Sequence, residues 1–143
     1  MTCLFCDLAH GGSPISEVYR DELAFAFMDI QPVNPGHVLV VPLAHSTYLS
    51  DLDPDVGAHL FKVAHKVAAA VRESSLRAEG INLFLADGEA AGQEVLHVHL
   101  HVLPRFSDDG FGLRFGSNYK DLPPRPELDS IAARLRALLR DAA

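Results

Sequence analysis

The sequence lacks the usual features of proteins that bind nucleic acid or cross a membrane. Only 12 of its 143 residues are Lys or Arg, against 19 Asp or Glu, which gives a formal net charge of −7. The basic residues form no cluster, so we expect no nucleic-acid partner. No apolar run approaches the roughly 18–20 residues of a membrane-spanning helix, so we expect no membrane partner.

Cysteine is also scarce, since Cys3 and Cys6 are the only two. The first ten residues, MTCLFCDLAH, have neither the basic nor the apolar segment of a secretory signal. We therefore expect a cytoplasmic protein. The chain contains no internal repeat or linker-like stretch, and its length is typical of one domain, here residues 1–143.

Hydrophobic patterning and turn residues predict an α+β fold. Asp53 and Pro54 are typical of a helix start, and an apolar face recurs every three or four residues from there to about Arg77. A last helix is expected to begin near Pro126 and to bury Leu128, Ile131, Leu135 and Leu138. The predicted strands are 16–20, 23–28, 37–41, 81–85 and 95–103. Together these elements predict a five-stranded, mostly antiparallel sheet with one long helix and a C-terminal helix.

The most informative segment places three histidines at alternate positions, His97, His99 and His101. On a strand, alternate side chains share one face, while Val98, Leu100 and Val102 point into a core. Imidazoles in such a row indicate either a metal site or phosphate chemistry.

The residues around this row favour phosphate chemistry. Gly88, Gly92 and Gln93 lie just upstream, in a loop whose backbone N–H groups can approach phosphate oxygens. His37, at the start of another predicted strand, is a further candidate donor to phosphate.

The segment His97-Val98-His99-Leu100-His101-Val102-Leu103 resembles the His-φ-His-φ-His-φ-φ motif of the histidine triad (HIT) family of nucleotide hydrolases and transferases. Further segments match the family's order and spacing, and the resemblance covers nearly the whole chain. These segments are Phe27-Met28-Asp29-Ile30, Pro35-Gly36-His37, Val41-Pro42-Leu43-Ala44-His45, Ala91-Gly92-Gln93 and Pro104-Arg105. The resemblance implies a single domain with a HIT-like fold.

The resemblance also implies a two-step reaction at the α-phosphate of nucleoside phosphoramidates or dinucleoside polyphosphates. His99 is the implied nucleophile, which holds the nucleotidyl group covalently until water releases a nucleoside monophosphate. The other implied catalytic residues are His97, His101 and Gln93. The chemistry is expected to need no cofactor.

The same resemblance implies a binding site for a purine nucleotide. Asp29 is expected to accept hydrogen bonds from the ribose hydroxyls, and Phe27 and Ile30 to flank the base. His37, Gln93 and His101 are carried over as phosphate-binding groups.

Cys3 and Cys6 suggest a zinc knuckle, which needs two more ligands. Spacing alone offers His10. Resemblance to a zinc-bearing branch of bacterial HIT proteins instead implies His45 and His97. The implied zinc is structural, with four protein ligands and no open position.

Two alternatives to the hydrolase remain at this point. One is a non-catalytic nucleotide-binding regulatory protein with the same fold, and the other is a zinc hydrolase that uses the histidine row as its metal site. The family is commonly homodimeric, so the resemblance implies a homodimer with the long helix and a strand at the interface.

One position departs from the family pattern. Glu94 stands five residues before His99, where many members carry Ser or Thr. An ionised carboxylate only accepts hydrogen bonds and repels anions. Glu94 therefore either points to solvent without effect or favours neutral or amine leaving groups over polyphosphates, and the second is our hypothesis.

Overall fold

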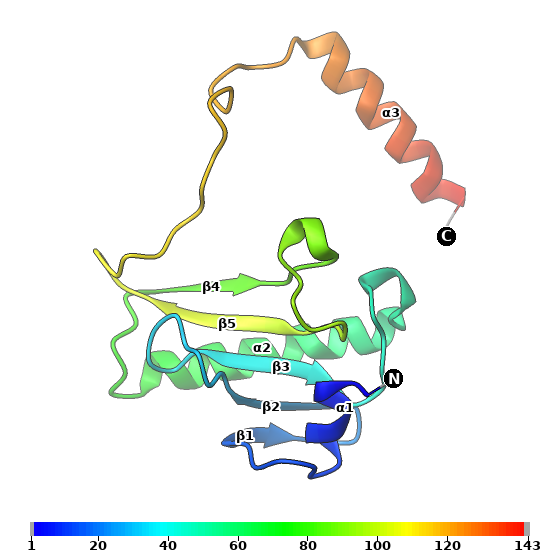
Figure 1. Cartoon of the computed structure of the whole chain (residues 1–143). Coiled ribbons are helices and arrows are strands. Elements are labelled where there is room, and N and C mark those ends of the chain that lie inside the picture. Colours follow the sequence, from blue (N-terminus) through cyan, green and yellow to red (C-terminus); the bar gives the residue numbers. More distant parts are fainter. Residues whose placement is uncertain (1, 142–143) are drawn as a thin grey trace. The chain divides into compact units, whose positions relative to one another are not determined.

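The computed structural model of the chain describes residues 2–141 (Figure 1). It contains two compact units, Met1–Phe111 and Gly112–Ala143, and each is described by itself below. A single domain over residues 1–143 stays a prediction.

The larger unit is built on a five-stranded antiparallel sheet, which confirms the predicted α+β class. The strands lie in the order β1-β2-β3-β5-β4, so β1 and β4 are the edges. Each neighbouring pair is antiparallel. The strand bounds are Glu17–Arg20 for β1, Ala24–Met28 for β2, Val38–Pro42 for β3, Gly80–Phe84 for β4 and Leu100–Arg105 for β5.

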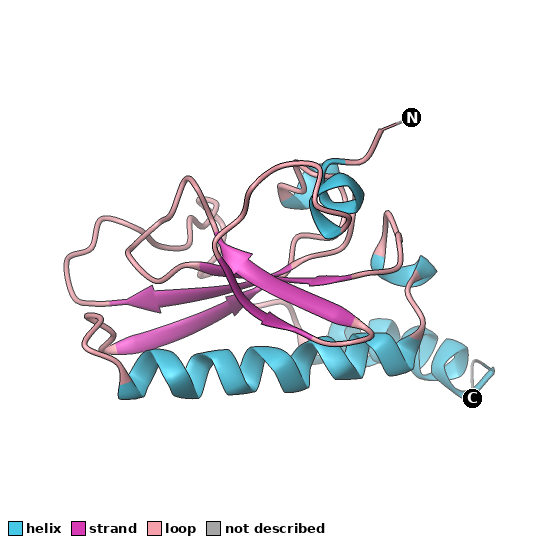
Figure 2. Cartoon of the chain, turned by 90° about the horizontal axis from the view of Figure 1, so that it is seen from below, coloured by secondary structure: helices cyan, strands magenta, loops and turns pink. Residues whose placement is uncertain are grey.

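Helix α2 (Pro54–Glu73) runs across one face of this sheet (Figure 2). It begins as predicted, with Asp53 as N-cap accepting a hydrogen bond from the Asp55 backbone N–H at 2.8 Å. It ends at Glu73 rather than near Arg77, because Ser74 has an extended backbone and its hydroxyl donates to the Val71 carbonyl. The apolar face of α2 packs against Ala24, Ala26, Val38, Val40 and Val102 of the sheet and against Val98, which precedes β5.

A second, smaller core covers the opposite face of the sheet, where the sequence did not predict a helix. Here α1 (Leu4–Ala9) packs Phe5 against Phe25, Phe27, Leu39 and Val41. Because strand residues alternate between faces, β2 and β3 supply both cores. Two short 3₁₀ helices, η1 (Leu49–Asp51) and η2 (Glu89–Ala91), complete the regular elements of this unit.

The last predicted strand, residues 95–103, begins later than expected. Strand β5 starts at Leu100, because the His97 N–H donates to Val95 O at 2.9 Å and the Val98 N–H to Ser46 O at 2.8 Å. The alternation nevertheless holds, since Val98 and Val102 belong to the core under α2.

The smaller unit contains α3 (Arg125–Asp141), so the terminal helix is present. The predicted burial of its apolar face is wrong, since Leu128, Ile131, Leu135 and Leu138 are 38%, 40%, 57% and 66% exposed. Among the described residues of this unit α3 is the only helix or strand, so no second element offers its apolar face a partner.

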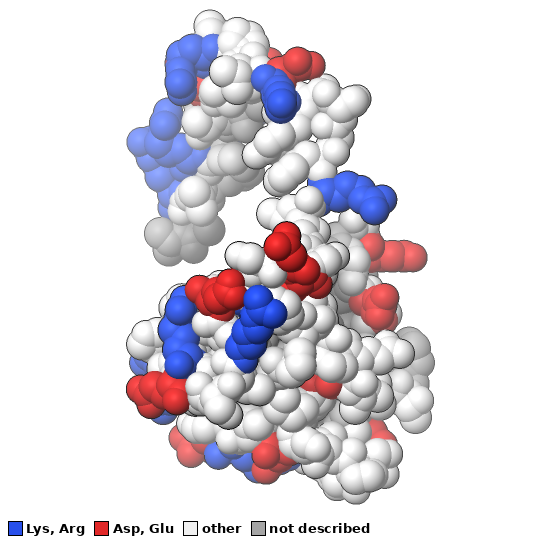
Figure 3. Space-filling view, turned by 90° about the vertical axis from the view of Figure 1, so that its left-hand side faces the viewer, with Lys and Arg blue, Asp and Glu red and all other residues white. Residues whose placement is uncertain are grey.

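The charge distribution of the larger unit agrees with the sequence. On the part of the larger unit that Figure 3 shows, in the lower half of the picture, acidic and basic side chains are interspersed and form no continuous basic patch. Within residues 2–141, no helix has both the length and the apolar composition needed to cross a bilayer.

Candidate functional site

The three histidines of the row lie on the sheet face covered by α1. His97 and His99 are buried, with 0% and 6% of their surface exposed, and they directly precede β5, which contains His101. The rings of His99 and His101 are neighbours, with centroids 4.9 Å apart. The three histidines therefore share one face, as predicted, and this face is the one opposite α2.

The hydrogen bonds of His99 select one tautomer of its imidazole. Its Nδ1 lies 2.8 Å from the carbonyl oxygen of His97, which can only accept a hydrogen bond. We therefore assign the proton to Nδ1, which leaves the Nε2 lone pair free. A free imidazole lone pair is what a nucleophilic histidine requires.

A chain of hydrogen bonds selects the tautomer of His101 in the same way. The Val33 N–H donates to His37 Nδ1 at 3.1 Å, so the proton of neutral His37 is on Nε2. That N–H donates to His101 Nδ1 at 2.9 Å, which leaves His101 with a proton on Nε2. His101 can therefore donate one hydrogen bond to a ligand.

Burial keeps this pair of imidazoles neutral. Burial, together with the neighbouring imidazoles of His99 and His37, lowers the pKa of His101 to about 4, against the opposing attraction of the Asp29 carboxylate. Burial also lowers the pKa of His37, against the opposing attraction of the Asp29 carboxylate. Both rings are consequently neutral near pH 7, where the hydrogen-bond chain described above applies.

A cavity of about 570 Å³ opens beside His99 and His101. This volume lies within the range of about 300–1,000 Å³ typical of small-molecule sites. Among the described residues, no Lys or Arg lines the cavity, and its only carboxylates are those of Asp29 and Glu94. Its apolar lining includes Leu4, Phe5, Leu8, Ile15, Phe27, Ile30, Leu39 and Phe84.

The three predicted nucleoside-binding residues all line this cavity but differ in exposure. Phe27 is 4% exposed and belongs to the core, whereas Ile30 is 96% exposed. Asp29 is partly committed, because its Oδ1 accepts the Gln31 N–H at 2.8 Å and its Oδ2 lies 3.5 Å from His37 Nε2. Thus Ile30 is not a core residue, and its side chain is free to contact a ligand.

Gln93 has a different position from the one expected of a phosphate ligand. It is buried, and its amide nitrogen donates to Thr47 O at 2.8 Å and Val95 O at 3.1 Å. Its Oε1 accepts the Gly88 N–H at 2.8 Å. Both amide protons are therefore used to fix the loop that leads to the histidine row, and a phosphate contact by Gln93 stays a prediction.

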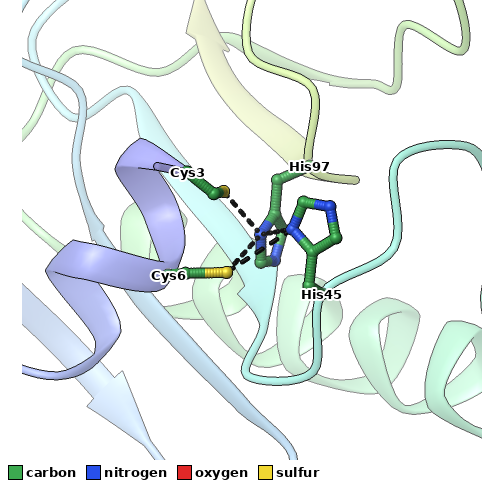
Figure 4. A group of neighbouring side chains, drawn as sticks. All are labelled: Cys3, Cys6, His45 and His97. Atoms are coloured by element: carbon green, nitrogen blue, oxygen red, sulfur yellow. Dashed lines mark hydrogen bonds between the residues drawn. The ribbon is translucent and has the colours of Figure 1, made fainter. Parts of the chain in front are cut away.

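Cys3, Cys6, His45 and His97 meet in one cluster, although they come from segments far apart in the sequence (Figure 4). His97 Nδ1 lies 3.3 Å from Cys3 Sγ, 3.6 Å from Cys6 Sγ and 3.3 Å from His45 Nδ1. The distance from Cys6 Sγ to His45 Nδ1 is 3.4 Å. The alternative ligand His10 is not a member of the cluster, and its Nδ1 contacts the Cys6 carbonyl instead.

These distances fit a tetrahedral zinc site. Zinc bound at about 2.0 Å from nitrogen and about 2.3 Å from sulfur separates neighbouring ligand atoms by about 3.3 Å for N···N and about 3.5 Å for S···N. In addition, His97 Nε2 donates to the Pro42 carbonyl at 2.8 Å, so its Nδ1 carries the lone pair that faces the cluster. Such a bond from the second ring nitrogen is typical of metal-binding histidines.

A second group of possible ligands, Asp29, His37 and His101, does not fit a metal. The Val33 N–H donates to His37 Nδ1, so the lone pair of His37 points to the backbone and its proton faces His101. Metal binding at His37 Nε2 requires the opposite tautomer. This second group is therefore a hydrogen-bond chain.

Helix α1 contributes cavity residues that sequence reasoning missed. Leu4, Phe5 and Leu8 line the cavity, and the Phe5 ring lies edge-on to His99 with centroids 5.0 Å apart. The apolar residues between and after the cysteines were the available signal, but six residues are too few for hydrophobic periodicity to predict a helix.

Comparison with known proteins identifies the class to which this fold and site belong. The sequence matches the HIT domain over residues 11–108, and the chain belongs to the HIT family. An uncharacterised HIT-like protein from Borreliella burgdorferi is 42% identical over 116 residues, or 80% of this chain and 84% of that protein. The crystal structure of a HIT family protein from Bacillus anthracis has a TM-score of 0.87 and 37% identity, covering 94% of this chain and 95% of that one.

Two further relatives bear on chemistry. A zinc-bound histidine triad family protein from Mycobacterium smegmatis is 37% identical with a TM-score of 0.75, covering 100% of this chain and 99% of that one. An adenylylsulfatase from Arabidopsis thaliana, HINT3, is 31% identical over 107 residues, which are 75% of this chain and 54% of that protein. The family thus includes both a zinc-bound member and a hydrolase.

The burial of His101 predicts a measurable titration. Its pKa in the folded protein lies below the ordinary histidine value of 6.5, so the unfolded chain binds more protons between about pH 6.5 and about pH 4. The free energy of unfolding should therefore fall as the pH falls through this window. In NMR spectra the His101 ring signal, assigned by its loss in His101→Gln, should titrate with a midpoint near pH 4. A midpoint above pH 6 would contradict the assigned neutral pair.

Proposed function

We propose that this protein is a nucleotide hydrolase or nucleotidyl transferase that cleaves at the α-phosphate through a covalent nucleotidyl-His99 intermediate. The observation that carries the proposal is the free Nε2 of His99, held in that tautomer by the His97 carbonyl beside a cavity of nucleotide size. Family membership supports the same class of reaction.

In the first step, the Nε2 lone pair of His99 attacks the α-phosphorus. The bond from phosphorus to the leaving group breaks, and its electron pair stays with the leaving group, which takes up a proton from solvent. The His101 Nε2–H donates to a non-bridging phosphate oxygen, where negative charge develops. The positive charge that forms on the His99 ring is stabilised by its Nδ1–H bond to the His97 carbonyl.

In the second step, water attacks the phosphorus of nucleotidyl-His99. The P–N bond breaks, the nucleoside monophosphate leaves, and His99 regains its neutral form as the proton of the attacking water is released. Phe27 and Ile30 flank the base in this proposal, and Asp29 accepts from the ribose hydroxyls. A purine, with its larger ring system, makes more contact with this apolar lining.

The charges around the cavity favour a leaving group with little negative charge. The lining has two carboxylates, Asp29 and Glu94, and no Lys or Arg among the described residues. An anionic polyphosphate leaving group meets repulsion from Glu94, whereas an amine does not. We therefore favour nucleoside phosphoramidates over dinucleoside polyphosphates as substrates.

We assign a structural zinc ion to Cys3, Cys6, His45 and His97. Such an ion supplies a cross-link between α1 and the sheet and takes no part in the reaction, because four protein ligands leave no position for a catalytic water. We also propose that the protein forms a homodimer through α2 and the edge strand β4. These elements have exposed apolar side chains, such as Phe61 and Phe84, that an interface would bury.

Substitution of the nucleophile tests the reaction itself. His99→Ala should reduce kcat by several orders of magnitude, because it removes the attacking atom, and should leave nucleotide affinity within a few-fold. The readout is monophosphate release from adenosine 5′-phosphoramidate together with AMP binding by calorimetry. Turnover above about 1% of wild type would place the nucleophile elsewhere. Nucleotide binding without any wild-type turnover would instead favour a regulatory protein.

The zinc assignment predicts the behaviour of a cysteine variant. Cys3→Ser combined with Cys6→Ser should remove one equivalent of zinc and lower the melting temperature, while kcat changes little, because a structural zinc site contributes to folding and not to the chemical step. Elemental analysis and thermal unfolding provide the measurements. Wild-type protein purified without chelators and found free of zinc would refute the assignment.

The charge argument predicts a change of selectivity in one variant. Glu94→Ser should shift the ratio of kcat/KM for diadenosine tetraphosphate to that for adenosine 5′-phosphoramidate upward by about tenfold, since it removes a repelling charge. The control is Glu89→Ser, which removes the same charge from η2, outside the cavity lining. An equal ratio in wild type and Glu94→Ser would exclude Glu94 as a selectivity residue.

A further inference from the structure

Helix α1 belongs to two sites at once. With its N-cap residue it provides two thiols of the Cys/His cluster, and it also provides Leu4, Phe5 and Leu8 to the lining of the cavity. Phe5 is the centre of this arrangement, with 4% of its surface exposed. Its ring lies edge-on to Phe27, His97 and His99, at centroid distances of 5.7, 5.8 and 5.0 Å.

Apart from this cluster, α1 is attached to the sheet mainly by the packing of buried Phe5 and of the partly buried Leu8 and Ala9. A helix of six residues is far below the about 12–15 residues at which isolated helices become marginally stable. The side chain of its N-cap residue Cys3 makes no capping hydrogen bond. Outside the cluster, the one hydrogen bond from the described sheet strands to α1 runs from Arg20 to the Ala9 carbonyl, at 3.3 Å and exposed to solvent.

We propose that α1 is a wall of the nucleotide cavity held by the metal, so that metal occupancy of the Cys/His cluster sets the affinity for nucleotide. Phe5 is the positioning residue that links the two sites, because it packs on His97 of the cluster and on Phe27 and His99 of the cavity. This inference rests on the proposed function, since it requires that the cavity binds a nucleotide.

The cluster is linked to the cavity by a second route, through the chain itself. His97 is a cluster member, and its carbonyl oxygen accepts the His99 Nδ1–H. A shift of His97 would change its hydrogen bond to His99, and therefore the nucleophile and kcat. Loss of the α1 wall removes contact surface from the bound nucleotide, so it should appear in KM and in the dissociation constant.

The first experiment compares AMP binding by calorimetry to the wild-type protein with zinc bound and after chelation. Chelation should weaken AMP binding by about tenfold or more, as expected for the loss of a buried aromatic contact with its neighbours. Hydrogen exchange should show residues 4–9 losing protection while the core residues of α2 keep theirs. Equal AMP affinity in the two states would overturn the coupling. Absence of AMP binding to the zinc-bound protein would overturn the proposed nucleotide site itself, and the coupling with it.

The second experiment tests Phe5 in zinc-bound protein and needs no chelation. Phe5→Ala keeps all four cluster residues, so it should bind one zinc yet bind AMP about tenfold more weakly, with KM changed more than kcat. Phe5→Leu, which retains an apolar side chain, should restore most of the affinity. The control Phe106→Ala removes the same side chain at a position that stacks on Arg77, outside the cavity and the cluster, and should bind AMP as wild type does.

Two results would contradict the role of Phe5. In the first, Phe5→Ala binds AMP as tightly as the wild-type protein does. In the second, chelation weakens AMP binding by Phe5→Ala as much as it does in the wild-type protein, which would assign the coupling to His97. If Phe5→Ala loses its sheet, the double variant Leu4→Ala and Leu8→Ala trims the same wall at less buried positions. It should show the same weaker AMP binding with zinc retained, and unchanged affinity there would overturn the proposal.

Discussion

The buried imidazole of His97 is the contact on which the rest of the site depends. It is fully buried, and its Nε2–H donates to the Pro42 carbonyl at the end of β3. That bond turns Nδ1 toward Cys3, Cys6 and His45, and the backbone carbonyl of the same residue holds the Nδ1–H of His99. One residue thus connects the sheet, the Cys/His cluster and the nucleophile, and a buried polar ring is stable there because both its nitrogens have partners.

The sequence predicted the parts of the fold that arise from local periodicity. Apolar residues that recur every three or four positions after Pro54 predicted α2, whose buried face includes Leu60, Val63, Val67 and Val71. The alternation in 97–103 predicted which histidines share a face. The family resemblance pointed to His45 and His97 as the residues that accompany the two cysteines, and the structure brings these four together. Spacing alone offered His10 instead. The helix and the strand face follow from short-range order in the chain, whereas the pairing of the cysteines with distant histidines came from the family resemblance alone.

Predictions failed where contacts between distant segments decide the outcome. Strand β5 starts at Leu100 because the backbone before it bonds to Ser46, and α1 forms because Phe5 finds a core made by β2 and β3. In α3 the local pattern predicted the helix correctly, but burial also needs a packing partner. The described residues of its unit contain no other helix or strand, so the apolar face of α3 is exposed. Likewise, no local sequence pattern predicts that both amide protons of Gln93 are donated to the backbone carbonyls of Thr47 and Val95.

The central claim is that His99 carries the nucleotidyl group during turnover, and trapping this intermediate tests it most directly. Zinc-bound protein is mixed with adenosine 5′-phosphoramidate, quenched in alkali at successive times within one turnover, digested and analysed by mass spectrometry. The account predicts an adenylyl group on His99 that appears before AMP and decays as AMP is released. Turnover without any covalent adduct, or an adduct on another residue with the same kinetics, would contradict it.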